Sequence, residues 1–424
     1  MSAARAAAMA APETTAPRPA PRGLLFVLPA LVAFQAISTD LYLPALPAIG
    51  ADLRASVEQV QLTLSLFLVG FGVAQLGWGP FSDRIGRRPL LLAGTGLYVA
   101  ASLACLAAPS IEALVAARFV QAVAACSGVV LGRAVVRDLF EPAEAAKVLA
   151  YLGTAMALAP ILGPVLGGWL TLTFGWRSTF AALALFGLFC VAGVLLAVPE
   201  TNRRKDPNAT RPAVLAANYA GLLGDRLYLA RVAVAALGYA GIFSFISGSP
   251  HVLIDAVGLR PDQYGLCFAG GVAGWMVGTF AAGRLNRRLG LAGLLRVGTR
   301  LAAAGALAGL GWALLAPPSW PAVVAPMFLF MLGAGFTLPT AMALAIGPYP
   351  QKAGLASALL GFLQLLFAAL VGLAVSALYD RTAVPMMGAL VLVTAAALLL
   401  VRRAAGERPR PADEALSAPG RSSP

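Results

Sequence analysis

Long apolar runs separated by short basic breaks constrain this sequence more than any other feature. Only 12% of its 424 residues are charged and 59% are hydrophobic, whereas a soluble domain carries about 25% charged residues. A hydrocarbon core about 30 Å thick needs about 20 apolar residues for each helix that crosses it. On that rule the chain is predicted to have twelve membrane-spanning helices, at residues 24–47, 59–80, 89–108, 111–136, 145–172, 176–198, 227–249, 263–283, 291–315, 320–347, 353–378 and 384–401.

The predicted spans fall into two groups of six, which indicates an all-α membrane protein with two six-helix bundles. A related motif at residues 79–88 and 283–290 follows the second span of each group, so the bundles are expected to be pseudo-symmetric. The part of the linker at 212–224 is moderately apolar and is expected to form a surface helix. We predict disordered tails at 1–22 and 403–424, bundles at 23–198 and 227–402, and a linker at 199–226.

The net charge of +13 follows the pattern of a membrane protein and not that of a nucleic-acid-binding protein. If the N-terminus is cytoplasmic, only Arg54, Arg177, Arg260 and Arg381 of the 31 basic residues fall on the outside, while Arg118 lies within a span. Cytoplasmic loops carry this excess of basic residues, so both termini are predicted to be cytoplasmic. The four cysteines are spread singly over apolar runs, which favours packing over a disulfide or zinc site.

Asp40 is the only carboxylate well inside a predicted span. A charge at the bilayer centre costs at least about 2.5–3.5 kcal/mol, so an acid there is expected to be functional. A carboxylate that alternates between wet and dry surroundings can take up and release a proton. We therefore predict that Asp40 couples transport to protons; a wetted, structural acid at the helix mouth is the alternative.

Arg118 is predicted to lie at the same depth as Asp40, in the fourth span. A buried guanidinium needs an anionic or carbonyl partner, and Asp40 is the side-chain acid available at that level. We expect the two to pair when the acid is charged, with Gln121 as a polar neighbour. Capping of Arg118 by backbone carbonyls, without a coupling role, is the alternative.

The substrate path is expected to run between the bundles at mid-membrane. On an ideal helix, Asp40 lies off the face that carries its polar neighbours. Either the helix distorts near Pro44, or the acid and the polar stripe face different surfaces. The candidate substrate-binding residues are Gln35, Thr39, Tyr42, Gln121, Tyr239, Phe243 and Gln364.

Two glycine-containing motifs are candidates for moving parts. The first is a predicted gating loop in which Gly86 permits a tight reversal; a plain topogenic loop is the alternative. The second lies in the fifth span, where a proline kinks the helix and glycines allow a neighbouring helix to approach closely. The gating residues are Gly79, Asp83, Arg84, Gly86, Arg87 and Arg88 with Asp138 as a partner of Arg87, and the glycine stripe consists of Gly163, Pro164, Gly167 and Gly168.

Several classes of function are excluded by what the sequence lacks. It contains no Gly-x-x-x-x-Gly-Lys-Ser/Thr loop, which excludes ATP drive through such a loop. It contains no buried group of His, Glu and Cys that suits a metal or a nucleophile, so we expect neither an enzyme nor a cofactor. The one histidine, His251, is expected to be an interfacial cap, with a proton relay as the alternative.

Together these motifs resemble the major facilitator superfamily. Residues 79–88 resemble its signature loop, Arg118-x-x-Gln121 its fourth-helix motif, and residues 163–168 the fifth-helix motif that marks antiporters. Residues 38–47 (STDLYLPALP) are similar to the first helix of the Bcr/CflA subfamily of drug:proton antiporters. Val32 stands where some multidrug relatives carry a second acid, which leaves one titrating acid in the first span.

The resemblance implies a proton-coupled exporter of a small amphipathic drug or antibiotic, similar to bicyclomycin, chloramphenicol or a sulfonamide. It implies a monomer in the bacterial inner membrane whose partners are the substrate, protons and lipid, with no nucleic acid. The alternatives are an exporter of an endogenous metabolite (a sugar, a purine or the cell's own secondary metabolite) and a transporter-like receptor. It also sets the second and eleventh helices side by side, so Asp83 is expected to bond the start of the eleventh helix near Lys352 and Gly354 and to hold the outward-open state.

Overall fold

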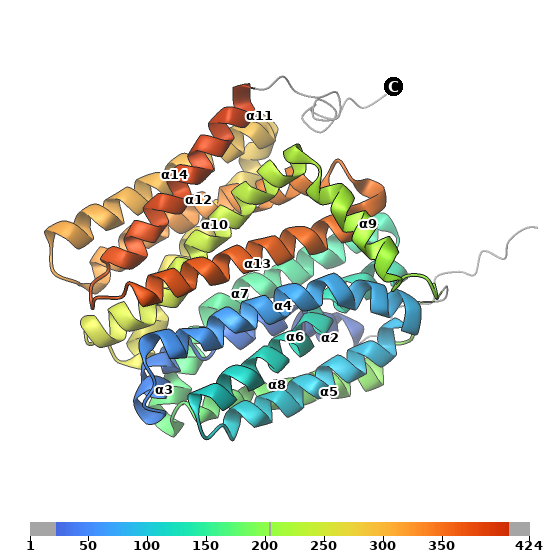
Figure 1. The fold of residues 1–424 in the computed structure, drawn as a ribbon, viewed down its shortest axis with the longest axis horizontal. Helices are drawn as coiled ribbons and strands as arrows, with labels where there is room; N and C mark the ends of the chain where they lie inside the picture. Colours follow the sequence, from blue (N-terminus) through green and yellow to red (C-terminus); the bar gives the residue numbers. More distant parts are fainter. Residues whose placement is uncertain (1–22, 203–204, 407–424) are drawn as a thin grey trace, which may run out of the picture.

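The computed structural model describes residues 23–202 and 205–406, and its long helices lie side by side across the view in Figure 1. The expected tails lie outside the described residues, except that 403–406 continue the last helix. The helices are α2 (Leu24–Asp40), α3 (Leu46–Asp52), α4 (Val57–Ile85), α5 (Arg87–Leu106), α6 (Ile111–Leu139), α7 (Pro142–Phe174), α8 (Arg177–Ala197), α9 (Pro212–Leu223), α10 (Arg226–Pro250), α11 (Pro261–Leu315), α12 (Trp320–Ile346), α13 (Ala353–Ala377) and α14 (Val384–Gly406), with short 3₁₀ or π turns η1 (Leu43–Ala45), η2 (His251–Ala256) and η3 (Pro350–Lys352).

The described residues contain eleven helices long and apolar enough to cross a membrane, and α11 supplies two spans. It has 55 residues, or about 83 Å at 1.5 Å per residue, far more than one crossing needs. Its backbone breaks at Gly290, where φ is 62° and ψ is 173°. Glycines on both sides of that break, Gly274 and Gly298, pack against α12. The twelve predicted spans are thus present in this part of the chain, and the all-α fold with two bundles is confirmed.

Gly86 and Gly290 make equivalent reversals in the two halves. Gly86, with φ of 124°, separates α4 from α5, and Gly290 separates the two parts of α11. Each comes seven residues after the first glycine of its motif, Gly79 or Gly283. Residues with a side chain rarely adopt a positive φ, so the reversal falls on the glycine. The two expected loops are therefore mostly helical, with the turn confined to this one residue.

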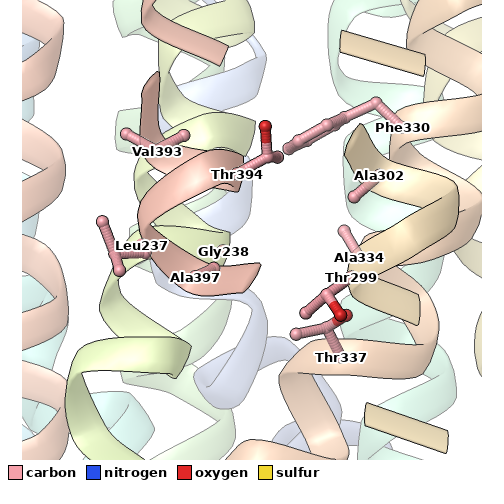
Figure 2. A pocket seen from close by; sticks show the side chains of 10 residues that line it. All are labelled: Leu237, Gly238, Thr299, Ala302, Phe330, Ala334, Thr337, Val393, Thr394 and Ala397. Carbon is pink, nitrogen blue, oxygen red and sulfur yellow. The ribbon is translucent and has the colours of Figure 1, made fainter. Parts of the chain in front are cut away.

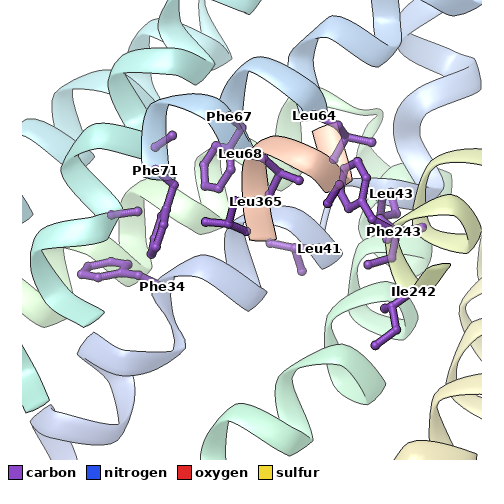
Figure 3. Packing of buried hydrophobic residues seen from close by; sticks show 14 of the residues in the cluster. Phe34, Leu41, Leu43, Leu64, Phe67, Leu68, Phe71, Ile242, Phe243 and Leu365 are labelled. Carbon is purple, nitrogen blue, oxygen red and sulfur yellow. The ribbon is translucent and has the colours of Figure 1, made fainter. Parts of the chain in front are cut away.

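Two helix pairs carry most of the contact between the halves, α4 with α13 and α7 with α11. In Figure 3 the side chains of Leu43, Leu64 and Phe67 from the first half lie near those of Phe243 and Leu365 from the second. Lipid tails are as apolar as these side chains, so such a contact gains nothing from leaving water. Close packing of the side chains holds it together instead.

The linker helix predicted at 212–224 is present as α9, and it contacts both halves. The hydroxyl of Tyr219 donates a hydrogen bond to the carbonyl oxygen of Leu76 in α4, 3.2 Å away. Three residues on, Leu222 is buried in a cluster with Leu359 and Leu360 of α13. The linker therefore packs as a structured bridge along the ends of α4 and α13.

Candidate functional site

Asp40 ends α2 and is only 3% exposed. The Thr39 hydroxyl donates to one Asp40 carboxylate oxygen at 3.0 Å. Two tyrosines of the second half, Tyr239 in α10 and Tyr264 in α11, lie within electrostatic range of this carboxylate. The acid therefore lies beside α7, the helix through which the first bundle contacts α11 of the second.

Both alternatives for the first span apply, because the helix distorts and its polar residues diverge. After Asp40 the α-helix gives way to a turn and to η1, which contains Pro44. Ser38 lies 2.6 Å from the Tyr98 hydroxyl inside the first bundle. Asp40 instead faces α7, where a Cβ atom added to Gly163 would lie 3.0 Å from the Cβ atom of Asp40.

The glycine stripe of α7 lets two other helices approach its backbone. A Cβ atom on Gly167 would lie only 1.7 Å from the carbonyl oxygen of Leu41, immediately after Asp40. A Cβ atom on Gly168 would lie 2.2 Å from the carbonyl oxygen of Pro261, at the start of α11. The stripe thus packs α2 on one side and the second half of the molecule on the other.

Arg118 is fully buried in an aromatic enclosure inside the first bundle. Its guanidinium carbon lies 4.2 Å from the ring centres of both Tyr42 and Phe67, a geometry that stabilises a cation. One guanidinium nitrogen donates to Gln121 at 2.5 Å, and the Gln121 amide donates to Ser102 at 2.7 Å. The arginine is therefore held by rings and a side-chain amide.

The expected ion pair between Arg118 and Asp40 is absent from this structure, because the aromatic rings and Gln121 surround the guanidinium while Asp40 faces α7. The same geometry revises two candidate substrate contacts. The Tyr42 hydroxyl lies 3.0 Å from Thr63, and Tyr42 and Gln121 are both fully buried within the first bundle. In this structure they serve the packing of Arg118 and do not line the junction of the halves.

The remaining candidate contacts lie on the helices that border that junction. Gln35 and Tyr239 are half-buried, in α2 and α10. Phe243 packs against Gly372 of α13, where a Cβ atom would lie 2.7 Å from its ring, and Gln364 is buried in the same helix. Thr39 is buried in α2, and α10 and α13 pack against each other.

The predicted contact of Arg87 with Asp138 is present, at 3.1 Å, at the end of α6. Asp83 does not bond the start of α13. Its carboxylate accepts from Arg87 at 2.6 Å, one helical turn away. A Cβ atom added to Gly354, near the start of α13, would have no neighbouring atom within 4 Å. These ion pairs therefore lie within the first bundle and do not join it to the second.

Glu200 is a site residue that sequence reasoning missed. Its two carboxylate oxygens accept hydrogen bonds from the backbone amides of Arg87 and Arg88, at 2.9 and 3.3 Å. A negative group is favoured at a helix N-terminus, where the first amides lack partners. Glu200 thus caps α5, and the available signal in the sequence was an acid at the start of the predominantly basic break between the two groups of spans.

The other three named gating residues also lie at this end of the first bundle. Arg84 donates to the Thr210 hydroxyl in the linker at 2.8 Å, and Arg88 donates to the carbonyl oxygen of Leu195 at 2.9 Å. A Cβ atom on Gly79 would have no neighbouring atom within 4 Å. The linker and the end of α8 therefore hold the gating segment.

His251 begins η2 and is 4% exposed. Its Nδ1 atom lies 2.9 Å from an Asp255 carboxylate oxygen, and its carbonyl oxygen accepts from the Tyr379 hydroxyl at 2.8 Å. Among the described residues, no group of three or more His, Cys, Asp or Glu side chains could hold a metal ion.

A small cavity of about 20 Å³ lies inside the second bundle, between α10, α11, α12 and α14 (Figure 2). Three threonines reach its wall, but each hydroxyl bonds a backbone carbonyl of its own helix, as Thr394 does with Leu390 at 2.7 Å. The cavity is walled by one half only, so it is separate from the junction at Asp40. Its lining residues are Leu237, Gly238, Thr299, Ala302, Phe330, Ala334, Thr337, Val393, Thr394 and Ala397.

The chain matches the family model of the Major Facilitator Superfamily over residues 30–372. It belongs to the major facilitator superfamily. A bicyclomycin resistance protein homolog from Haemophilus influenzae is 31% identical over 88% of this chain and 92% of its own length. Multidrug resistance protein D from Escherichia coli is 31% identical over 89% of this chain and 94% of its own. These relatives agree with the resemblance to the Bcr/CflA subfamily.

The superfamily fold is also evident from solved structures. The crystal structure of a bacterial homolog of the human lysosomal transporter Spinster, in an inward-facing and occupied conformation, matches with a TM-score of 0.69. It covers 89% of this chain and 96% of the other at 16% identity, so the likeness concerns the fold. Because the chain belongs to the major facilitator superfamily, it is a multi-pass membrane transporter and not an enzyme.

Proposed function

We propose that this transporter exports small drug-like molecules across the bacterial inner membrane in exchange for protons. The observation that carries the proposal is Asp40, the only Asp or Glu among the buried residues of the described chain. It lies between the bundles, against a glycine stripe of α7 and near tyrosines of α10 and α11. A buried acid at a helix junction can bind a proton on one side of the membrane and release it on the other.

The contacts between the halves support an alternating cycle. If the termini are cytoplasmic, as the basic loops predict, the packing of Gly168 on Pro261 closes the outer side of the path. On the inner side, Asp83 makes no bond to α13. We propose that the structure is closed outside, that both termini are cytoplasmic and that the transporter acts as a monomer.

The names of the two relatives favour a drug or antibiotic as the exported molecule. The half-buried Gln35 and Tyr239, together with Thr39, Phe243 and Gln364, are the proposed contacts. Such a set offers aromatic surface and a few hydrogen-bonding groups, which suits a small amphipathic compound.

Transport by the purified protein in proteoliposomes tests the proposal. With an imposed pH gradient, the wild type is expected to accumulate bicyclomycin, chloramphenicol or a sulfonamide, and Asp40→Asn is expected to lose this uphill transport while remaining folded. Glu112→Gln, at an exposed acid of α6, is the matched control. Uphill transport by Asp40→Asn at the wild-type rate would contradict the role of Asp40. Binding without any flux would identify a receptor, and gradient-driven flux of a sugar or purine alone would identify a metabolite exporter.

A further inference from the structure

Arg133 lies within a membrane helix and not in a loop. The positive-inside assignment placed it on the cytoplasmic side, but α6 continues as far as Leu139. Arg133 comes six residues before that end, which is about 9 Å along the helix axis. The residue is half-buried, so its charge is partly removed from water and still accessible.

The guanidinium of Arg133 has no anionic partner in the part of the chain that the structure describes. Its one hydrogen bond runs to the thioether sulfur of Met156 in α7, at 3.6 Å, and a thioether is a weak acceptor. The nearest acid along α6, Asp138, accepts bonds from Arg87 and Thr201 instead. Holding a partly desolvated cation without a counter-charge costs free energy. An anionic ligand at Arg133 would offset that cost.

The position of Arg133 relates it to Asp40. Met156 comes seven residues before Gly163 on α7, and seven residues complete nearly two turns, so both lie on one face. Gly163 packs against Asp40, so Arg133 lies near the same face, about 10 Å closer to the start of α7. The preceding residue, Gly132, approaches α2, where a Cβ atom would be 3.3 Å from Val32.

We infer that Arg133 binds an anionic group, such as a carboxylate, on the molecule that the transporter exports. A guanidinium presents paired donors that match the two oxygens of a carboxylate. The polarisable side chain of Met156 beside it can contact the apolar part of the same molecule. This inference rests on the proposed export function and names its substrate class: an amphipathic monoanion that contacts Arg133 on the cytoplasmic side of Asp40.

Binding of three probes of matched shape to the full chain in lipid nanodiscs tests the inference. The probes are 2-naphthoate, 2-naphthamide and 2-naphthylmethylammonium, which differ in charge. The wild type is expected to bind 2-naphthoate at least about tenfold more tightly than the amide, as a charge-assisted pair requires. Arg133→Gln is expected to remove that preference without weakening amide binding, and Arg133→Lys to keep part of it. The matched control is Arg137→Gln, which removes an exposed cation one turn away.

Equal affinity of the wild type for all three probes would overturn the inference, as would an unchanged preference in Arg133→Gln. Unaltered amide binding shows that each variant is folded. The proposed function is scored separately, because Asp40→Asn is expected to lose gradient-driven transport but to keep the preference for 2-naphthoate. One outcome would separate the two proposals: normal export of a neutral drug, with no variant altering the preference for 2-naphthoate over 2-naphthamide. That outcome would support proton-coupled export and contradict the anion site at Arg133.

Discussion

Gly163 of α7 packs tightly against Asp40 of α2: a Cβ atom there would be 3.0 Å from the Asp40 Cβ atom. The motif and the acid are more than 120 residues apart in the sequence, and they form one contact. Pro164 on the neighbouring face of α7 approaches Gly265 of α11, so α7 contacts both the surroundings of the acid and the second half of the molecule.

Gly167→Ala is expected to impair both folding and transport. The added methyl group would lie 1.7 Å from the Leu41 carbonyl oxygen, and backbone cannot move aside as a flexible side chain can. Overpacking of this kind costs about 1–3 kcal/mol, so thermal unfolding in detergent should begin at a clearly lower temperature. Gly153→Ala on the same helix, where no atom lies within 4 Å, is the control. Equal unfolding temperatures for the two variants would show that the helices separate easily.

Arg118 and Gln121 are expected to be energetically coupled. Their hydrogen bond of 2.5 Å is buried, so removing either partner leaves the other unsatisfied. A double-mutant cycle with Arg118→Met and Gln121→Leu should give a coupling energy of about 0.5–3 kcal/mol, read from chemical unfolding in detergent micelles. Strict additivity would mean that the aromatic rings alone hold the guanidinium.

Removal of the Glu200 charge is expected to loosen the start of α5. Glu200→Gln keeps the shape but weakens the bonds to the Arg87 and Arg88 amides, at a cost of about 0.5–1 kcal/mol for a helix cap. Hydrogen exchange of these two amides should become faster. Glu141→Gln, at the N-cap of α7 where no side-chain cap bond is present, should leave exchange at its helix start unchanged. A faster rate in both variants would argue against a specific cap.

Asp138→Asn is expected to destabilise the gating segment more than Asp83→Asn does. Both acids contact Arg87, but the Asp83 side chain is 48% exposed and that of Asp138 is 25% exposed. Asp138 also accepts from Thr201, and exposed ion pairs contribute only about 0–1 kcal/mol. Thermal unfolding of the two variants in one detergent gives the order directly. The reverse order would indicate that Asp83 has a further partner under those conditions.

The spans, the linker helix and the reversal at Gly86 could be predicted because each rests on local physics. Apolar length specifies a crossing, and a φ as high as the 124° at Gly86 strongly favours glycine. The surroundings of Arg118 could not be predicted in this way. Equal depth suggested a pair with Asp40, but depth does not give the direction of a side chain around its helix. The aromatic rings that enclose Arg118 come from residues far apart in the sequence, so their meeting depends on tertiary packing.

The cap that Glu200 places on α5 joins groups 113 residues apart in the chain. A ribosome delivers α4 and α5 to the membrane long before it has made Glu200. When this hairpin inserts, the first amides of α5 therefore still lack the Glu200 carboxylate as a partner. The carboxylate reaches them only after α8 has been made. The cap can therefore form only when α8, the last helix of the first bundle, is in place beside the start of α5.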